Sequence, residues 1–519
     1  MERGACWCAS DSRISQARVT YPHVCLKHTA NPVLVCLCPQ VALAVPVQFL
    51  YNVYLHPLAH FPGPMLNRGS NIPKMIHQIR GTVHEEMLRL HQIYGPVVRL
   101  APNELTYTSA TALKEIYGNR GGKKSMPPQT ALGKHDKMMF GATAFIWLES
   151  HAEHLRHRKI LATSFSESSL RAQEPIILGY AQQLTNQLRG RAARGEVVDL
   201  WAWFNYLTFD VIGDLTFGEP FDCVKDGQFH PWISFIFSNL TNMMYSQMII
   251  TMGIFGTFIE MLVPKKIWAE AISHAQATRD KVDRRLARKT ERPDFVTGFM
   301  KHINQPGGIT SNELYADSNI FLMAGSETSA TLLAVAVYYL LRNPQKLAKL
   351  QEEIRSAFSR EEDVTFGPVS KMPYLLAVIN ESLRMHPPLP AGINRTVSSG
   401  GAFIDDQLVP EGTILQVPHW AAFHLEANFQ DPLVFVPERW LEACPARYIN
   451  DNRDVFQPFS YGQRNCIGRS LAYMEAKITL ARLIMTFDME LMPESAGWNQ
   501  QRVFLLWEKR PLYVRLTAR

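Results

Sequence analysis

The stretch that decides the fold runs from Phe459 to Gly468 and reads FSYGQRNCIG. It matches the spacing F-x-x-G-x-R-x-C-x-G, and with average residue use a chance match to such a pattern arises on the order of once in 10,000 chains of this length. A helix is predicted to begin after Gly468, so backbone N–H groups would point at Cys466 and lower the pKa of its thiol. Gly462 permits a tight turn around the sulfur. The stretch predicts a loop that presents a thiolate.

The other fixed residues of this loop suit a flat ligand that carries a carboxylate. Arg464 offers a fixed cation for the carboxylate, and Gly468 lets the following helix approach a flat ligand closely. Phe459 is expected to shield the sulfur from water and to keep it electron-rich. The alternative is a buried structural cysteine in a glycine-containing turn.

Length and composition indicate a large folded body. Of the 519 residues, 46% are hydrophobic and 19% are charged, which excludes a disordered chain and a protein with many membrane spans. The net charge of +6 does not indicate nucleic-acid binding. Five of the eight cysteines lie in the first 38 residues, unlike a secreted disulfide framework, so the body is expected in a reducing compartment.

Three segments are expected along the chain. Residues 1–32 form an irregular leader. Residues 33–55 contain no charged side chain, and this run is long enough for a single N-terminal membrane anchor. Pro39 and Pro46 weaken the pattern, and the alternative is a buried or poorly formed segment. After a stiff Pro-Gly-Pro joint at 62–64, residues 56–519 form the body.

The body is predicted to be mainly helical, an α+β fold with few strands that lie in groups. Apolar periodicity and helix start and stop signals predict helices at 84–94, 151–164, 310–342 and 374–385, after Pro344, and after Gly468. Short strands are predicted at 97–100, 104–108, 402–408 and 413–418.

The loop around Cys466 resembles the haem-binding loop of the cytochrome P450 family, the haem-thiolate monooxygenases. The resemblance covers residues 56–519. It implies the cytochrome P450 fold, in which haem b (iron protoporphyrin IX) lies between a long central helix and the cysteine loop. It also implies that Cys466 is the axial ligand of the iron, whose thiolate pushes electron density toward bound oxygen.

Two further segments are similar to motifs of that family. Residues 381–384 (ESLR) have the form E-x-x-R, and residues 437–440 (PERW) resemble P-E-R-F with Trp in place of Phe. The i, i+3 spacing puts Glu381 and Arg384 on one helix face. The resemblance implies that Glu381, Arg384 and Arg439 brace the core behind the cysteine loop in a structural role.

The long helix carries a third match at residues 324–329 (AGSETS), which resembles the pattern A/G-G-x-D/E-T. Gly325 costs about 1 kcal/mol in a helix interior relative to Ala, and an opened turn there would make room for a small ligand beside the haem. The resemblance implies catalytic roles for Thr328, as hydrogen-bond partner of the oxygen ligand, and for Glu327, as a proton relay from solvent. The alternative is a polar surface patch on a core helix.

A fourth match concerns the haem propionates. His154 and Arg158 take the positions of Trp and Arg in the family's W-x-x-x-R, and Arg395 matches another propionate-binding position. The departure from Trp puts His154 in more doubt than Arg158. The basic run at 156–159 offers a docking face for an acidic reductase, or is a solvated helix face.

The resemblance extends to fungal enzymes of secondary metabolism of the trichothecene hydroxylase type, on residues 55–64, 94–105 and 435–441. It implies oxidation of a hydrophobic terpenoid or polyketide-type substrate with O2. The sequence has no strand–G-x-G-x-x-G–helix unit, so electrons are expected from an NADPH-cytochrome P450 reductase. The expected location is the endoplasmic reticulum membrane, with the catalytic domain facing the cytosol.

Two other functions remain open at this stage. One is a haem-thiolate isomerase or dehydratase, which needs no proton relay to oxygen and is therefore disfavoured by Glu327 and Thr328. The other is a non-catalytic haem sensor or carrier, which NADPH consumption that depends on a ligand and a reductase would exclude.

Overall fold

The computed structural model describes residues 43–118, 126–128, 131–230, 263–288, 290, 292–508 and 510–519, and the single positions 232, 245, 248, 249 and 256. Met1–Leu50 and Tyr51–Arg519 are two separate compact units. The leader predicted at 1–32 and positions 33–42 of the predicted anchor lie outside the described residues.

One described helix is long and apolar enough to cross a membrane, and this helix is α15 (Ser311–Arg342). Its most apolar window is 83% buried within the protein, which is typical of the core helix of a globular body. The described part of the predicted anchor belongs to a shorter apolar helix, Leu43–Leu55. The anchor at 33–55 therefore stays a prediction.

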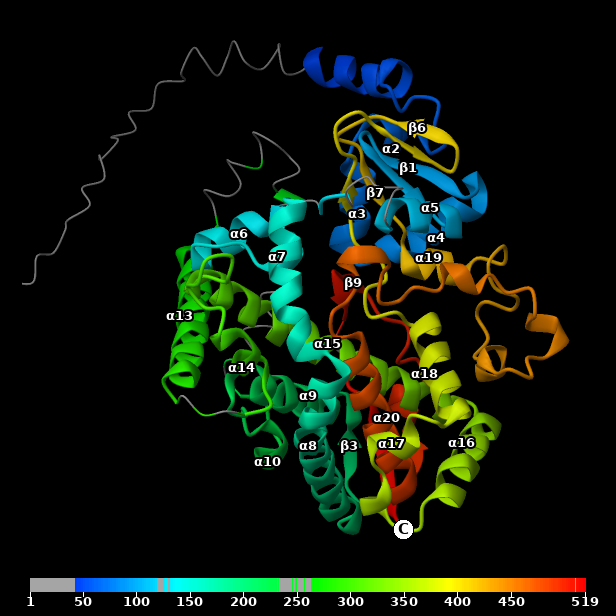
Figure 1. The fold of residues 1–519 in the computed structure, drawn as a ribbon. Coiled ribbons are helices and arrows are strands. Elements are labelled where there is room, and N and C mark those ends of the chain that lie inside the picture. Colours follow the sequence, from blue (N-terminus) through cyan, green and yellow to red (C-terminus); the bar gives the residue numbers. More distant parts are fainter. Residues whose placement is uncertain are drawn as a thin grey trace, which may run out of the picture. The chain divides into compact units, whose positions relative to one another are not determined.

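The core is built around α15. The helix begins with a capping box, in which the Thr310 hydroxyl accepts the Glu313 N–H and the Glu313 carboxylate accepts the Thr310 N–H. It packs against α9 (Leu200–Phe217), whose residues are all buried, and against α18 (Pro373–Met385) and α20 (Arg469–Thr486). Figure 1 shows α15 passing through the middle of the helical body, which makes it the element that other helices contact.

The remaining helices surround this core. They are α2 (Met65–Gly69), α3 (Ile72–Arg80), α4 (Val83–Tyr94), α5 (Ala110–Tyr117), α6 (Ala131–Phe140), α7 (His151–Leu161), α8 (Glu167–Ala193), α10 (Cys223–Asp226), α13 (Lys265–Ala287), α14 (Phe295–Met300), α16 (Pro344–Ala357), α17 (Phe366–Val369) and α19 (His419–His424).

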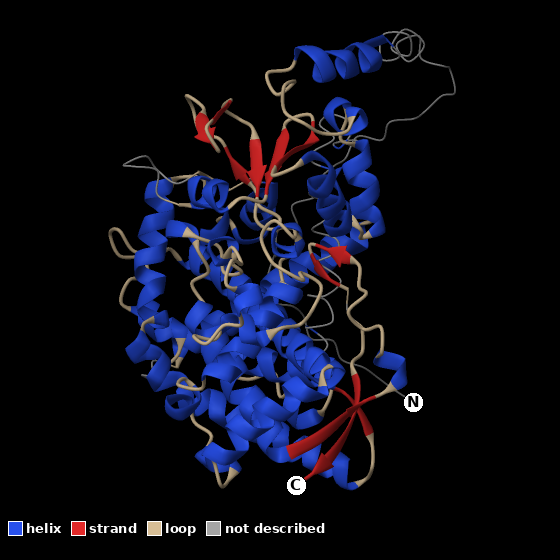
Figure 2. Ribbon diagram, turned by 90° about the vertical axis from the view of Figure 1, so that its right-hand side faces the viewer, coloured by secondary structure: helices blue, strands red, loops and turns tan. Residues whose placement is uncertain are grey.

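The strands form small sheets beside the helical body (Figure 2). One sheet has the order β1-β2-β7-β4, in which β2 runs parallel to β7 and the other neighbours are antiparallel. A second sheet has the order β3-β11-β8 and brings the C-terminal strand beside α8, and β9 pairs with β10. The bounds are β1 (Val97–Ala101), β2 (Glu104–Tyr107), β3 (Val197–Asp199), β4 (Arg395–Thr396), β7 (Ile414–Gln416), β8 (Phe487–Leu491), β9 (Val503–Phe504), β10 (Leu506–Trp507) and β11 (Tyr513–Ala518).

The predicted fold class, mainly helical α+β with few strands, is confirmed. Strand structure predicted at 402–408 is present as a hairpin of β5 (Ala402–Ile404) and β6 (Gln407–Val409). Asp405 and Asp406 turn the chain with φ values of 46° and 59°. Asp tolerates this left-handed conformation and favours a two-residue hairpin turn, which the apolar pattern alone did not reveal.

A buried ionic network lies where the E-x-x-R motif of α18 meets residues 437–440. The Glu381 carboxylate accepts hydrogen bonds from Arg384 at 2.8 and 2.9 Å and from Arg439 Nε at 3.2 Å. Arg439 also pairs with Asp451. The Trp440 indole donates to Glu381 Oε2 at 2.9 Å, so the Trp that replaces Phe adds a donor to the same carboxylate. Every charge of this network has a partner, as burial requires.

We expect Arg439→Leu to lower the free energy of unfolding by about 3–5 kcal/mol, because it leaves Glu381 and Asp451 buried without one of their cations. Urea unfolding followed by circular dichroism at pH 7 measures this. The control is Arg171→Leu, which removes an exposed pair with Glu167 and should have little effect. An equal loss in both variants would contradict the assignment.

Candidate functional site

The loop before α20 is closed by its own backbone. The Cys466 N–H donates to the Phe459 carbonyl at 2.8 Å. Gly462 has a φ of 76°, and a Cβ on it would lie 2.2 Å from the carbonyl oxygen of Tyr117. Only glycine fits position 462, because both the backbone conformation and the close approach exclude a side chain.

Cys466 lies deep within the protein, and yet its side chain has exposed surface, so that surface borders an interior space. Burial raises the pKa of the Cys466 thiol, while the backbone N–H of Gly468 and the charges of Arg158 and Arg469 act in the opposite direction. The lowered pKa predicted from the helix start is therefore wrong for the polypeptide by itself. A thiol that coordinates a metal ion is deprotonated outright, so this cysteine suits a metal ligand better than a free nucleophile.

The residues next to the Cys466 sulfur leave space beside it. A Cβ on Gly468 would meet only the Cys466 sulfur, at 4.0 Å. The protein alone therefore does not require glycine at 468, whereas a flat ligand against the sulfur would. The Phe459 ring lies 5.2 Å from that of Tyr473, on the loop side of α20.

One face of α15 also borders an interior space. Between residues 316 and 340 every side chain is buried except those of Ala324, Gly325 and Thr328. Ala324 and Thr328 are one turn apart, on one face of the helix. The long central helix is thus closed on all sides apart from a short opening at the residues that the sequence motif marks.

The details of this opening differ from two predictions. The helix is continuous, and no turn opens at Gly325; instead, a Cβ on Gly325 would lie 2.6 Å from Ile212 of α9, so glycine lets two core helices approach. Glu327 is 2% exposed, so its carboxylate does not itself reach the outer surface as a relay from solvent would require. The Thr328 hydroxyl donates to the Ala324 carbonyl at 2.6 Å, and its oxygen therefore remains able to accept a hydrogen bond.

The predicted propionate-binding cations come from three elements. Arg158 of α7 donates to the carbonyl of Asn465 at 2.6 Å and to its side-chain oxygen at 2.7 Å, directly before Cys466. Arg464 of the loop donates to the carbonyl of Leu148 at 2.8 Å. Arg395 of β4 is buried. These bonds to uncharged oxygens hold the guanidinium groups of Arg158 and Arg464 in place.

His154 lies within reach of all three cations. Burial, together with the charges of Arg464, Arg158 and Arg395, lowers the pKa of His154 to about 3. Burial and the charge of Arg395 lower the pKa of Arg464 to about 10. Nδ1 of His154 is buried without a hydrogen-bond partner among the described residues. Burial lowers the pKa of Arg158 and that of Arg395, and no carboxylate of the described chain offsets this effect.

A haem b fits this set of residues. Buried cations that lack a carboxylate need an anion, and the two propionates of haem supply one. The His154 nitrogen lacks a hydrogen-bond partner among the described residues, and the Cys466 sulfur borders an interior space where it can bind the haem iron. The structure thus brings together Cys466, Arg464, Arg158, Arg395 and His154, with Phe459 and Gly468 in the same loop.

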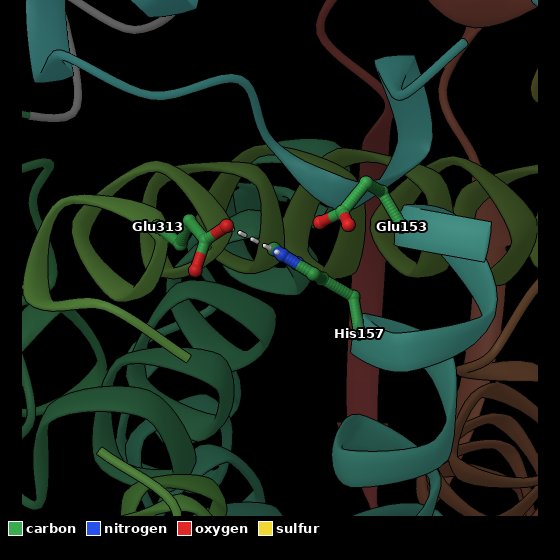
Figure 3. Close-up of side chains that lie close together, drawn as sticks. All are labelled: Glu153, His157 and Glu313. Carbon is green, nitrogen blue, oxygen red and sulfur yellow. Dashed lines mark ion pairs between the residues drawn. The ribbon is translucent and has the colours of Figure 1, made fainter. Parts of the chain in front are cut away.

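His157 of α7 belongs to a different cluster of charged side chains (Figure 3). The buried His157 imidazole bonds Asp317 of α15 through Nδ1 at 3.1 Å and pairs with Glu313 through Nε2 at 3.1 Å. Although burial opposes it, these two carboxylates raise the pKa of His157 to about 9. Asp317 also accepts the backbone N–H of Phe145 at 2.7 Å. His157 is therefore a buried cation that ties α7 to α15.

This cluster changes the interpretation of the basic run at 156–159. Arg156 pairs with Glu153 and Glu313, each at 2.6 Å, and His157 is buried, so neither forms part of a free docking face. Glu153, His157 and Glu313 are close enough to hold a metal ion. The guanidinium of Arg156 already pairs with both glutamates, and His157 pairs with Glu313, so the cluster is better described as an ion-pair network.

Several residues of the site were missed from the sequence. Asn465, which receives both bonds from Arg158, occupies an unspecified position of the loop motif and gave no signal. Asp317 lies 160 residues from His157, and only the burial of a charged residue within an apolar helix could have drawn attention to it.

Comparisons with known proteins agree with this geometry. The family model described as "Cytochrome P450" matches residues 62–515. The chain is 38% identical over 477 residues to "Cytochrome P450 monooxygenase astJ" of Aspergillus oryzae, covering 91% of this chain and 94% of that protein. It is 39% identical over 477 residues to "Cytochrome P450 monooxygenase lcsI" of Purpureocillium lilacinum, covering 91% of each. It is 38% identical over 473 residues to "Averantin hydroxylase" of Dothistroma septosporum, covering 90% of this chain and 88% of that protein.

We expect the free energy of unfolding to depend on His157 at alkaline pH. Folding raises the pKa of His157 from 6.5 to about 9, so the stabilisation is complete below pH 6.5 and is lost as the pH rises through 9. Its size is on the order of 3 kcal/mol. Urea unfolding at pH 7 and pH 10 should show a smaller pH effect in His157→Gln than in the wild type. Equal pH effects in both proteins would contradict a buried imidazolium.

Proposed function

Because the chain belongs to the cytochrome P450 family and is a cytochrome P450 monooxygenase, we propose that it oxidises a hydrophobic terpenoid or polyketide-type intermediate of fungal secondary metabolism. The proposal rests on one observation above all. A cysteine loop with room for a flat ligand lies beside a cluster of buried arginines. Among them, no carboxylate of the described chain compensates the burial of Arg158 or Arg395. We take the opening on α15 to border the same interior space.

Each residue has a role toward the cofactor in this proposal. Cys466 binds the haem iron, and the polypeptide N–H groups and Arg158 favour its thiolate form. Arg158, Arg395 and Arg464 hold the propionates, and Nδ1 of His154 gains a hydrogen-bond partner there. Phe459 covers the loop side of the sulfur. When bound through a thiolate, haem supplies the activation of O2 for insertion of one oxygen atom into the substrate.

The opening on α15 supports a role in oxygen chemistry. The Thr328 hydroxyl donates to its own helix and so offers its oxygen as an acceptor to a protonated group in the space beside it. Glu327 is buried next to it and can exchange protons only through intervening groups. Thr328 is proposed to hold a proton at this position, and Glu327 to pass protons toward it.

The electrons are proposed to come from an NADPH-cytochrome P450 reductase, since the sequence carries no dinucleotide-binding fingerprint. With Arg156 and His157 engaged in the ion-pair network, Lys159 is the exposed cation that the run at 156–159 offers to an acidic partner. The docking face must therefore include cations from other elements.

A location at the endoplasmic reticulum membrane is supported by α3. No residue of this helix is buried, and Ile72, Ile76 and Ile79 are exposed on one stripe, while His77 and Arg80 carry the basic character of its last turn. The β5–β6 hairpin exposes the paired residues Phe403 and Leu408 as well. Both features suit a protein that lies against lipid and takes up an apolar substrate.

The substrate is proposed only as a class. The names of the relatives above mention no trichothecene, so the narrower likeness to trichothecene hydroxylases receives no support from them. A haem-thiolate isomerase or a haem carrier would have no use for an acceptor hydroxyl at Thr328, and we favour the monooxygenase for that reason.

We expect the dithionite-reduced protein to show a strongly red-shifted Soret band with carbon monoxide, and Cys466→Ala to lose it, because only a thiolate ligand gives this shift. Cys444→Ala is the matched control: this half-buried free cysteine is not part of the 459–468 loop, and its loss should leave the band unchanged. Haem bound by the wild type without the shifted band would refute the role of Cys466.

We expect Thr328→Ala to keep the haem content and to reduce product formed per NADPH consumed by about tenfold, with a rise in hydrogen peroxide, because the hydroxyl that accepts a hydrogen bond at the opening of α15 is lost. The assay uses a fungal reductase and a ligand that shifts the Soret band. Thr331→Ala, a buried threonine three residues along α15, is the control. Unchanged coupling in Thr328→Ala would argue for the isomerase or carrier alternatives.

A further inference from the structure

An arginine begins the helix that follows the cysteine loop. Arg469 is the first residue of α20, and the first turn of this helix carries no acidic residue. A helix N-terminus has a positive partial charge, so a cation is unfavourable there and an anion is favourable. The helix by itself therefore gives no reason for an arginine at this position, and the contacts of its side chain supply one.

Two aromatic rings hold the guanidinium group of Arg469. Its central carbon lies 6.0 Å from the centre of the Phe459 ring and 6.0 Å from the centre of the Tyr473 ring. The two rings lie 5.2 Å apart at an interplanar angle of 45°. Each distance is at the outer limit for the attraction between a cation and an aromatic ring. Because both rings attract the same group, together they restrict it to one place beside the loop.

The pair of rings is itself fixed to the scaffold. Phe459 belongs to the cysteine loop, where its carbonyl accepts the Cys466 N–H at 2.8 Å. The Tyr473 hydroxyl donates to Oδ1 of Asn380 on α18 at 2.8 Å. Tyr473 follows Arg469 by four positions, on the same face of α20. The place of the guanidinium group relative to the Cys466 sulfur is therefore set by the loop and by two helices.

The chain does not offset the charge of Arg469. Its side chain is exposed, and among the described residues no carboxylate pairs with it. This charge acts on Cys466 and favours the thiolate, in the same direction as the Gly468 N–H and the charge of Arg158. Arg158 is bound to Asn465 and is assigned to a propionate. Arg469 is thus the arginine that remains for a role toward the sulfur alone.

We propose that Arg469 tunes the reduction potential of the haem bound at Cys466, and that Phe459 and Tyr473 position its charge. This inference rests on the proposed function and adds a residue to its electron-transfer step. In that step ferric haem takes up one electron and becomes ferrous, and the NADPH-dependent reductase gives up that electron. No bond forms or breaks, and Arg469 acts on the iron through the Cys466 sulfur.

The physical reason is the change in charge on reduction. One electron makes the site formed by haem and thiolate more negative by one unit. A nearby cation stabilises the more negative state, so Arg469 favours the ferrous form. Because the guanidinium group is exposed, water and salt screen its charge and keep the effect modest. Loss of the charge should therefore lower the reduction potential.

The test is a potentiometric titration of the haem-loaded full chain, followed by the absorbance of the ferric and ferrous forms at low salt. In Arg469→Gln we expect the equilibrium to move about fivefold toward the ferric form, a fall of about 40 mV at about 59 mV per tenfold for one electron. Arg469→Lys keeps the charge and should show less than half of this fall. At about 1 M salt the difference between the wild type and Arg469→Gln should shrink, because the Debye length is then about 3 Å.

Arg453→Gln is the matched control. It removes an exposed arginine of the short helix Arg453–Val455, and Arg453 is not among the groups that shift the pKa of Cys466. The reduction potential should therefore stay unchanged in this variant. Tyr473→Leu is a second test, since it keeps the charge of Arg469 and removes one of the two rings. It should lower the potential less than Arg469→Gln does, because the guanidinium group can then move into solvent.

An unchanged potential in Arg469→Gln would overturn the inference, even if the reductase reduced this variant more slowly, because that combination describes a docking residue only. Equal falls in Arg469→Gln and Arg469→Lys would overturn it as well, since the charge would not be the cause. A red-shifted carbon monoxide band in the same preparations shows that the haem-thiolate site is intact, so the proposed function would stand in either case. Absence of that band in the wild type would instead count against the proposed function itself.

Discussion

The buried cations near Cys466 are the constraint on which the rest of the structure depends. Removing a guanidinium from water is costly unless an anion is present, and the carboxylates of the described chain do not offset the charges of Arg158 and Arg395. A bound anion must therefore offset the free-energy cost of burying these guanidinium groups. A cofactor with two carboxylates and a metal ion meets it at the same place where the metal makes Cys466 a thiolate. Cofactor binding and folding stability are therefore linked, and the apoprotein should be the less stable form.

The protein treats its other buried charges in the opposite way. Glu381 accepts from two arginines and from the Trp440 indole, and His157 lies between two carboxylates, so each of these groups is satisfied by the chain itself. The first network ties α18 to residues 423–451, and the second ties α7 to α15. The second holds the helix that carries Arg158. This contrast distinguishes scaffold from binding site. The charges that are paired within the chain belong to the scaffold, and the cations that lack a carboxylate belong to the binding site.

How far the sequence predicts this molecule depends on how local the cause is. The cysteine loop, the E-x-x-R turn of α18 and the start of α15 at its capping box follow from a few adjacent residues, and the structure has a loop and helices at those positions. Causes that depend on distant partners were not visible. Gly325 is explained by Ile212 of α9, and Asp317 by His157, 160 residues away. The pKa of Cys466 was predicted in the wrong direction because burial, which a sequence does not give, outweighs the helix start.

Helix α15 shows how one buried element can serve several purposes. Because it is enclosed by other helices, each of its faces meets a different neighbour, and residues a turn apart can have unrelated roles. Asp317 faces α7 and fixes the helix that carries Arg158. Asn319 faces α13 and presents its amide to a small cavity, while Ala324 and Thr328 open onto the interior space. Because a helix is nearly rigid over three turns, the contact of Asp317 with α7 and the opening at Thr328 keep a fixed spacing and orientation.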